Sequence, residues 1–225
     1  MKDELIVNSN PKSIISEGIK TLRTNLQFAD LKKTMKTILF TSSLPGEGKS
    51  FVASNLAVAF AQNGSKTLIV DADLRKGRQH NVFNAKNDQG LSNLLIDDVE
   101  KNFKKYIKKT DIPNLSIITM GTIPPNPSEL LNSDQTKTLI EKLKEEYDII
   151  IIDSVPVNGL TDALILSNII DKTVIVCAIK VTPCDVLHKT KKSLENVGAD
   201  IAGIIVNKVP TDDSVYYNKY YSKYY

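Results

Sequence analysis

Apolar residues gather along the chain in short continuous runs, separated by polar turn residues and by segments of helical period. Because the runs are continuous rather than alternating, they predict strands covered on both faces, as in a parallel sheet. Strands that alternate with helices predict βαβ units, and so an α/β fold: a three-layer αβα sandwich with a mostly parallel sheet. The predicted strands are 37–40, 67–70, 115–118, 149–153, 173–179 and 201–206.

Helical spacing of apolar residues predicts helices between these strands. A further helix over 13–30 precedes the first strand and is expected to pack outside the sheet. The segment 123–131 is rich in proline, which favours a stiff loop there. The helices predicted between strands are 50–64, 134–147 and 184–198, and the first ends at Gly64, a residue type typical of helix C-termini.

A glycine-rich loop follows the first predicted strand, where the sequence TSSLPGEGKS leads into a helix. Backbone N–H groups at a helix N-terminus cradle polyphosphates, and Gly46 and Gly48 let the backbone come close to them. Lys49 is placed to reach the β- and γ-phosphates, and the Ser50 hydroxyl to hold Mg²⁺. Ser43 stands where the pattern G-x-x-x-x-G-K-[ST] has its first glycine. A glycine-proline turn beside an unrelated lysine would not explain the flanking strand and helix.

Carboxylates stand at the ends of two other predicted strands. Asp71 and Asp73 follow the second strand, and Asp153 ends the fourth. In an open parallel sheet, ligands bind outside the carboxyl ends of the strands, where the phosphate loop also lies. Three carboxylates at one edge repel each other unless a cation lies among them, so we expect Mg²⁺ held by Ser50, Asp153 and water. Either carboxylate pair alone would also suit a helix cap.

Composition narrows the class of protein. The 225 residues, of which 41% are apolar and 24% charged, suit one globular domain. A net charge of +3 is too small to indicate a nucleic-acid partner. No apolar run approaches 18 residues and the first 30 positions lack a signal peptide's apolar block, so no direct membrane insertion is expected. Cys177 and Cys184 form neither a zinc site nor a disulfide framework, which favours a reducing, cytoplasmic setting.

Tyrosine is unevenly distributed. Of eight tyrosines, six lie in the last ten residues, and they are Tyr216, Tyr217, Tyr220, Tyr221, Tyr224 and Tyr225. A terminal helix with an aromatic stripe is one interpretation, and a solvated tail without a role is another. The interpretation preferred here divides the chain into a domain over 1–208 and a flexible tyrosine-rich substrate tail over 209–225.

The three motifs SSLPGEGKS, VDADLRKG and IIIDSVP resemble the Walker A, A′ and B motifs of the bacterial tyrosine kinases of capsule and exopolysaccharide synthesis. The segments SEGIKTLRTNL, GLSNLL, PPNPSELL and GIIVNKV extend the resemblance over 16–225. It is closest to the type whose cytoplasmic kinase is a separate chain from its transmembrane activator. The resemblance implies a P-loop NTPase fold and an ATP- and Mg²⁺-dependent protein-tyrosine autokinase. Such an enzyme transfers the γ-phosphate to C-terminal tyrosines, mainly in trans, and regulates polysaccharide synthesis and export.

The resemblance also implies roles for individual residues. Lys49, Asp71, Asp73 and Asp153 match catalytic positions, with Asp71 acting on the incoming tyrosine hydroxyl. Ser50, Asp73 and Asp153 match the metal ligands. For Asn207, an adenine contact and a turn residue that closes a strand both remain open. The nucleotide-binding positions are Ser43, Pro45, Gly46, Glu47, Gly48, Lys49, Ser50, Phe51, Arg75 and Asn207.

Glu17, Lys20 and Arg23 are spaced to share one helix face, for which a solvated charged face is the simple interpretation. The family carries Glu-x-x-Arg-x-x-Arg here, as part of the contact that joins subunits into a ring. Lys20 replaces the first arginine and so lacks its bidentate fork. The implied partners are further copies of this chain, the cytoplasmic segment of a transmembrane activator of the polysaccharide co-polymerase type, and a phosphotyrosine phosphatase. The implied location is the cytoplasm, at the inner face of the membrane where the activator recruits the kinase.

Two other functions fit parts of the pattern. A switch ATPase that positions cell-division or partition machinery has a similar fold and phosphate loop, but usually carries a lysine where Leu44 stands and lacks a tyrosine tail. A non-enzymatic regulatory subunit would not need its catalytic residues intact, and those present here are Lys49, Ser50, Asp71, Asp73 and Asp153.

Overall fold

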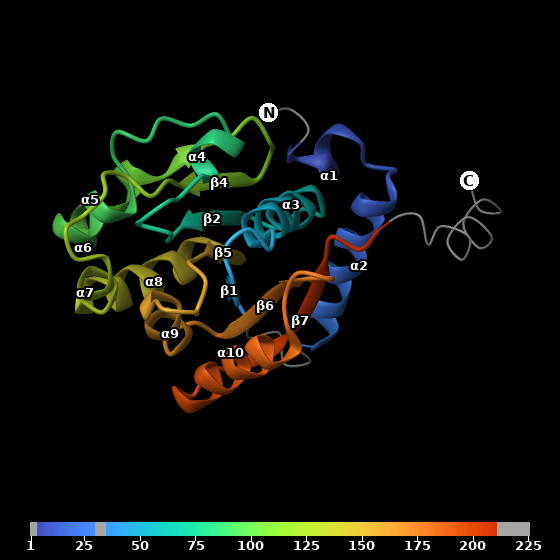
Figure 1. Ribbon diagram of the computed structural model, residues 1–225. Helices are drawn as coiled ribbons and strands as arrows, with labels where there is room; N and C mark the ends of the chain where they lie inside the picture. The colour runs from blue at the N-terminus through green and yellow to red at the C-terminus, as the bar shows by residue number, and fades with distance from the viewer. Residues whose placement is uncertain (1–3, 30–34, 211–225) are drawn as a thin grey trace.

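The computed structural model describes residues 4–29 and 35–210. In this part of the chain, seven strands form one sheet in the order β3-β4-β2-β5-β1-β6-β7 (Figure 1). Neighbouring strands are parallel except for β3, which is antiparallel to β4. The strands are β1 (Thr37–Ser42), β2 (Thr67–Asp71), β3 (Lys108–Lys109), β4 (Leu115–Ile118), β5 (Ile149–Asp153), β6 (Lys172–Ala178) and β7 (Ile201–Asn207). All six predicted strands are confirmed within two residues at each end.

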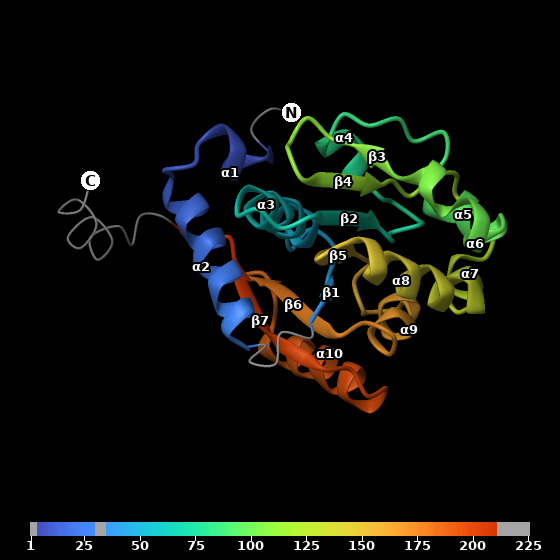
Figure 2. The same ribbon diagram turned by 180° about the vertical axis from the view of Figure 1, so that it is seen from behind.

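Helices cover both faces of the sheet, which confirms the three-layer α/β sandwich (Figures 1 and 2). One face packs against α1 (Ile6–Ser9), α2 (Ile14–Ala29), α3 (Lys49–Gln62) and α4 (Gln79–Val82). The opposite face packs against α5 (Leu91–Ile96), α6 (Val99–Asn102), η2 (Phe103–Tyr106), α7 (Pro127–Leu131), α8 (Asp134–Glu146), α9 (Asp162–Ser167) and α10 (Cys184–Asn196).

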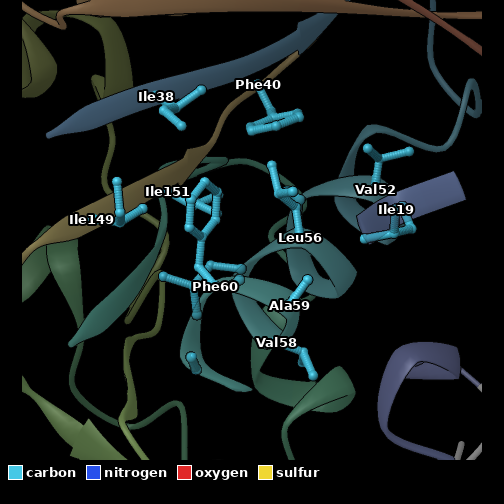
Figure 3. Packing of buried hydrophobic residues seen from close by; sticks show 14 of the residues in the cluster. Ile19, Ile38, Phe40, Val52, Leu56, Val58, Ala59, Phe60, Ile149 and Ile151 are labelled. Carbon is cyan, nitrogen blue, oxygen red and sulfur yellow. The ribbon is translucent and has the colours of Figure 1, made fainter. Parts of the chain in front are cut away.

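The helix that follows the phosphate loop, α3, is buried along nearly its whole length. A helix that is apolar on all sides belongs inside a protein, and α2 covers the outer side of α3. Figure 3 shows Leu56 and Phe60 of α3 between the strand residues Phe40 and Ile151 and the outer helix. This packing fixes the N-terminus of α3, where the phosphate loop ends, relative to the sheet.

Two expectations about local structure are wrong. Pro127–Leu131 forms α7 rather than a loop, because Pro127 occupies the first helical turn, where its missing N–H needs no partner. Strand β7 is not covered on both faces, because it is an edge strand with Ile204 42% and Val206 53% exposed. Among the described residues, no helix combines the length and apolar character needed to cross a membrane.

Candidate active site

The three motifs meet because of the strand order. Strand β5 lies between β1 and β2, so the chain segments that leave these three strands emerge side by side. Asp153 at the end of β5 is level with Phe40 of β1 and with Asp71 of β2. The phosphate loop after β1 and the carboxylates of β2 and β5 therefore share one edge of the sheet, as the motif positions predict.

The phosphate loop depends on glycine at two positions. Gly46 and Gly48 have φ angles of 79° and 93°, in the left-handed region that glycine adopts without strain. A Cβ atom on Gly48 would also lie 2.1 Å from Asn207 Nδ2. This amide nitrogen donates a hydrogen bond to the carbonyl of Glu47 at 2.9 Å, and Lys208 Nζ donates to the carbonyl of Gly46 at 2.7 Å. The last residue of β7 and the residue that follows it thus hold the backbone of the loop in place.

The side chain of Glu47 holds the loop from inside. It is buried, and it accepts hydrogen bonds from the N–H of Leu44 at 2.7 Å and from the hydroxyl of Thr182. Ser43 is also buried, and its hydroxyl has no partner among the described residues. Their predicted contacts with nucleotide stay predictions, since both side chains lie within the loop's own structure.

A cavity of about 570 Å³ opens beside this loop, a size ordinary for small-molecule sites. Of the predicted nucleotide-binding residues, Ser43, Glu47 and Asn207 are absent from its described lining. The lining comprises Pro45, Gly46, Gly48, Lys49, Ser50, Phe51, Asp73, Arg75, Lys76, Arg78, Val155, Pro156, Asn158, Leu160 and Lys208.

Lys49 connects the phosphate loop to the carboxylates. Its Nζ atom lies 3.2 Å from Asp153 Oδ1 and 3.6 Å from Asp73 Oδ2, and it donates a hydrogen bond to Ser50 Oγ at 3.2 Å. Burial alone would lower the pKa of Lys49, but Asp153 and Asp73 outweigh burial and the pKa is raised. Lys49 therefore stays cationic at neutral pH and offsets the negative charge of this edge.

Asp71 is fully buried, as is Asp153. Burial, together with Asp153 on the neighbouring strand, holds the pKa of Asp71 well above its ordinary value. One carboxylate oxygen accepts a hydrogen bond from the N–H of Gln79 at 2.9 Å, and the other has no partner in the described part of the chain. A Cβ atom on Gly77 would lie 2.7 Å from both oxygens, so only glycine lets this segment close over Asp71. A raised pKa suits a carboxylate that accepts a proton near neutral pH.

Arg75 faces a second network. Asp73 Oδ1 accepts hydrogen bonds from the N–H groups of Arg75 and Lys76 at 3.2 and 2.8 Å. The guanidinium of Arg75 binds both oxygens of Asp162 at 2.7 and 3.1 Å, and the hydroxyl of Ser128 donates to the same carboxylate at 2.6 Å. Arg75 lines the cavity, and its side chain ties the second motif to α7 and α9. Its predicted contact with nucleotide stays a prediction. Asp162 and Ser128 are not among the predicted site residues: Asp162 belongs to no motif, and Ser128 lies in the segment PPNPSELL, which has no spacing that indicates a site.

The pKa of Asp162 makes this network sensitive to pH. Burial alone would raise that pKa, but hydrogen bonds from Arg75 and Ser128 outweigh burial and the pKa is lowered. The ion pair therefore contributes stability above pH 4, the ordinary aspartate value, and loses it as the pH falls through the lower folded pKa. We expect Asp162→Asn to lower the free energy of unfolding by about 1–2 kcal/mol at pH 7. The deficit should shrink below about pH 4, where the wild-type carboxyl also takes up a proton.

Urea unfolding at pH 7, 5 and 3.5 measures this difference. The matched control is Asp134→Asn, because Asp134 is 95% exposed and pairs only with Lys137 on the same helix among the described residues. The control should change stability by less than about 0.5 kcal/mol. A deficit of Asp162→Asn that stays constant over this pH range would contradict the prediction.

The donor set at this edge fits a magnesium ion. Ser50, Asp73 and Asp153 provide hard oxygen atoms around Lys49, and two buried acceptors, one on Asp71 and one on Gln79, lack partners in the described structure. Within the described residues, no group of three or more His, Cys, Asp or Glu side chains is arranged to hold a metal ion. Mg²⁺ commonly binds through one or two carboxylates completed by water and substrate phosphates, which this arrangement allows.

The charged face of α2 has intrachain partners. Glu17 and Lys20 form an ion pair at 2.7 Å and are partly exposed. Arg23 instead donates a hydrogen bond to the carbonyl of Ala59 at 3.0 Å, near the C-terminus of α3, where a cation is favourable. The interpretation of a solvated charged face is therefore wrong for Arg23, because its side chain holds α2 on α3.

The fold and this edge of the sheet define a P-loop nucleoside triphosphatase, and the family model of the AAA domain matches residues 35–202. The CapB protein of Staphylococcus aureus, assigned as a tyrosine-protein kinase, is 38% identical over 97% of this chain and 95% of its own length. The crystal structure of the chimerical protein CapA2B2 is 42% identical, with a TM-score of 0.87, and covers 92% of this chain and 91% of that one. The chain belongs to the bacterial tyrosine-protein kinase family, within the AAA-domain proteins.

Some relatives are much longer. The Escherichia coli tyrosine-protein kinase Etk is 35% identical over 89% of this chain, which corresponds to 27% of Etk. Switch ATPases are more distant: the septum site-determining protein MinD of Pyrococcus horikoshii is 24% identical over 80% of this chain and 76% of its own, with a TM-score of 0.66. That likeness shows the shared fold alone.

Proposed function

We propose that this chain is an ATP-dependent protein-tyrosine autokinase that transfers the γ-phosphate of ATP to its own C-terminal tyrosines, mainly in trans. The observation that carries this proposal is the convergence of Lys49 with Asp73 and Asp153 at the mouth of the loop. This arrangement supplies a cation for the phosphates and oxygen ligands for Mg²⁺. The family membership supports tyrosine as the acceptor.

In the proposed reaction, a tyrosine oxygen attacks the γ-phosphorus, the bond from that phosphorus to ADP breaks, and Asp71 accepts the phenol proton. Tyrosine is mostly protonated at neutral pH, so a nearby base with a raised pKa assists the transfer. Lys49 and the N–H groups of the loop stabilise the charge on the transferred group. Bound Mg²⁺ would neutralise phosphate charge, with Ser50, Asp73 and Asp153 as its ligands.

The proposed acceptor of the phosphate is the tyrosine-rich tail, which begins close to the site. We propose a kinase domain over 1–208 and a substrate tail over 209–225, whose tyrosines lie outside the described residues. Asn207 and Lys208 contact the phosphate loop, so the tail starts beside the site. A flexible segment of this length has a root-mean-square span of roughly 23 Å and a maximum near 60 Å. That range includes the site of a neighbouring copy.

A mixing experiment tests both the kinase activity and its direction. One chain carries Lys49→Met with the native tail, and the other carries native Lys49 with all six tail tyrosines changed to phenylalanine. Incubated with Mg²⁺ and ATP, with an activator segment present, the mixture should gain phosphate on the tail of the Lys49→Met chain. Mass spectrometry of the two chains, distinguished by isotope labelling, locates the phosphate.

Each chain incubated alone is the control and should gain no tail phosphate. ADP release from the wild-type chain without phosphotyrosine would favour the switch ATPase. The absence of both products, with the activator segment present, would favour the regulatory subunit.

We propose that the chain forms a ring-shaped homo-oligomer in which the exposed parts of Glu17 and Lys20 contact a neighbour. We also propose that a separate activator recruits the chain from the cytoplasm to the inner face of the membrane. Phosphorylating six tyrosines would add roughly −9 to −12 charges and loosen such a ring by repulsion. A phosphotyrosine phosphatase would reverse this change. Equal oligomer size by light scattering before and after complete phosphorylation would contradict this link between phosphorylation and assembly.

The proposed biological role of the kinase is regulation of capsule or exopolysaccharide synthesis and export.

A further inference from the structure

Gln79, at the start of α4, touches all three motifs of the site although it belongs to none of them. It is 0% exposed. Its backbone N–H donates to Asp71 Oδ2 at 2.9 Å, and its side-chain Nε2 donates to Asp153 Oδ2 at 2.8 Å and to the carbonyl of Ser50 at 3.2 Å. One residue therefore joins the first turn of α3 to the ends of β2 and β5.

The chemistry of an amide suits this position. An amide nitrogen carries two protons, and both have an acceptor here. The opposite orientation of the amide would place Oε1 against the same two oxygen acceptors, so the surroundings determine which end points to Asp153. A carboxylate at this position would offer no donor and would add charge beside Asp153. An apolar side chain would take the Gln79 donor away from Asp153 Oδ2, whereas the carbonyl of Ser50 would keep the hydrogen bond that it accepts from the Ser54 hydroxyl.

The two carboxylates that Gln79 contacts oppose each other. Asp71 and Asp153 are level on adjacent strands, where like charges directly opposite are unfavourable. On the other side of Asp153, Lys49 binds Oδ1, which leaves Oδ2 to Gln79. The Asp153 carboxylate is therefore held by one donor on each oxygen, and Asp71 is held by the backbone of the same residue that holds Asp153. Gln79 thus fixes the relative placement of two groups that repel.

We propose that Gln79 is a positioning residue for the phosphotransfer reaction: it orients the carboxylates of Asp153 and Asp71 without contacting the reacting atoms. This inference rests on the proposed use of Mg²⁺ and ATP at this site. Groups that hydrogen-bond to metal ligands from behind commonly change metal affinity or activity 10- to 100-fold when removed. Gln79 therefore acts on the Mg²⁺ requirement of the site rather than on the phosphate loop's own affinity for nucleotide.

The test uses the full chain and a fluorescent ADP analogue, titrated with Mg²⁺ or kept in EDTA. In Gln79→Leu, the Mg²⁺ concentration that gives half of the maximal gain in ADP affinity should rise about 10- to 100-fold, while the affinity in EDTA stays at the wild-type value. The kcat for phosphotransfer should fall by a similar factor. Asn81→Ala is the matched control, because Asn81 lies on the same short helix and is exposed. It should match the wild-type chain in every measurement.

Gln79→Asn keeps the amide but shortens its reach by one methylene, so a smaller rise in the Mg²⁺ requirement is expected. This variant replaces Gln79→Leu in the test if circular dichroism shows that Gln79→Leu does not fold. A folded variant of Gln79 with the wild-type Mg²⁺ requirement would overturn the inference. An equal loss of affinity with Mg²⁺ and in EDTA would also overturn it, because Gln79 would then support the loop alone. A wild-type chain whose ADP affinity does not respond to Mg²⁺ would instead refute the proposed function.

Discussion

Lys49→Met is expected to reduce phosphotransfer by about 10²- to 10³-fold. Lys49 lines the cavity at the start of α3, and its cationic side chain is the group of the loop placed to meet the charge of the transferred phosphoryl group. Methionine keeps an unbranched side chain of similar reach but carries no charge. The comparison is made on kcat for tail phosphorylation, measured by quantitative mass spectrometry at saturating Mg²⁺ and ATP.

The same substitution should also destabilise the metal-free protein. The side chain of Lys49 is 11% exposed and lies between Asp153 and Asp73, whose negative charges would lose their buried counter-charge. Removing one partner of a buried ion pair lowers the free energy of unfolding by about 3 kcal/mol. Urea unfolding in EDTA measures this loss. Lower activity together with unchanged stability in EDTA would contradict the position of Lys49 between the two carboxylates.

Lys189→Met provides the control for both measurements. Lys189 lies on α10 and is 78% exposed, with a loose pair to Asp185 at 3.6 Å. Exposed pairs of this kind contribute at most about 1 kcal/mol. We expect wild-type activity and nearly wild-type stability. A comparable loss of activity in this variant would show that the effect of Lys49→Met is not specific to the site.

Gly90→Ala is expected to lower the free energy of unfolding by about 3 kcal/mol, which is the upper range for overpacking a buried position. A Cβ atom there would lie 2.1 Å from the carbonyl oxygen of Thr119 and 2.4 Å from the backbone nitrogen of Gly121. Both neighbours are main-chain atoms that no side-chain rotation can move away. The N–H of Leu91 also donates to the carbonyl of Thr119 at 2.7 Å. The added methyl group would therefore disrupt the hydrogen-bonded contact between the end of β4 and the start of α5.

Gly18→Ala is the matched glycine substitution. Gly18 lies in α2, is exposed, and has no atom within 4 Å of an added Cβ. Alanine is the better helix former, so this variant should gain about 0.5–1 kcal/mol. Thermal and urea unfolding of the two variants should therefore differ in sign. A Gly90→Ala protein as stable as the wild type would show that the contact between Gly90 and Thr119 is not tightly packed.

The parts of the site that sequence analysis predicted are those whose chemistry is local. The spacing of Gly46, Gly48 and Lys49 between a strand and a helix specifies a phosphate loop by itself. Asp71 and Asp153 each stand at the end of an apolar run. Because a strand ends where its apolar run ends, both residues are predicted at the carboxyl edge of the sheet. A run of five to seven residues carries enough information for such predictions.

The missed parts depend on contacts between distant segments. Gln79 binds Asp153 across 74 positions, and Arg75 binds Asp162 across 87. Glutamine, serine and aspartate are common on protein surfaces, so nothing in their spacing marks them as buried partners. The contact of Asn207 has no signal in the sequence for the same reason: its amide donates to the carbonyl of Glu47, 160 positions earlier.

The sequence by itself determined the fold class, the positions of six strands and the phosphate loop that follows the first of them, because each depends on the chemistry of neighbouring residues. It also identified the tyrosine-rich segment, since composition needs no coordinates. Only the tertiary structure decided which polar groups are buried together and form ion pairs or hydrogen bonds with one another. Placing β5 between β1 and β2 buries Asp71 beside Asp153, raises the pKa of Asp71, and gives Lys49 and Gln79 their common acceptor. Burial and pairing are properties of the packed sheet, because water screens and solvates the same groups until the strands come together.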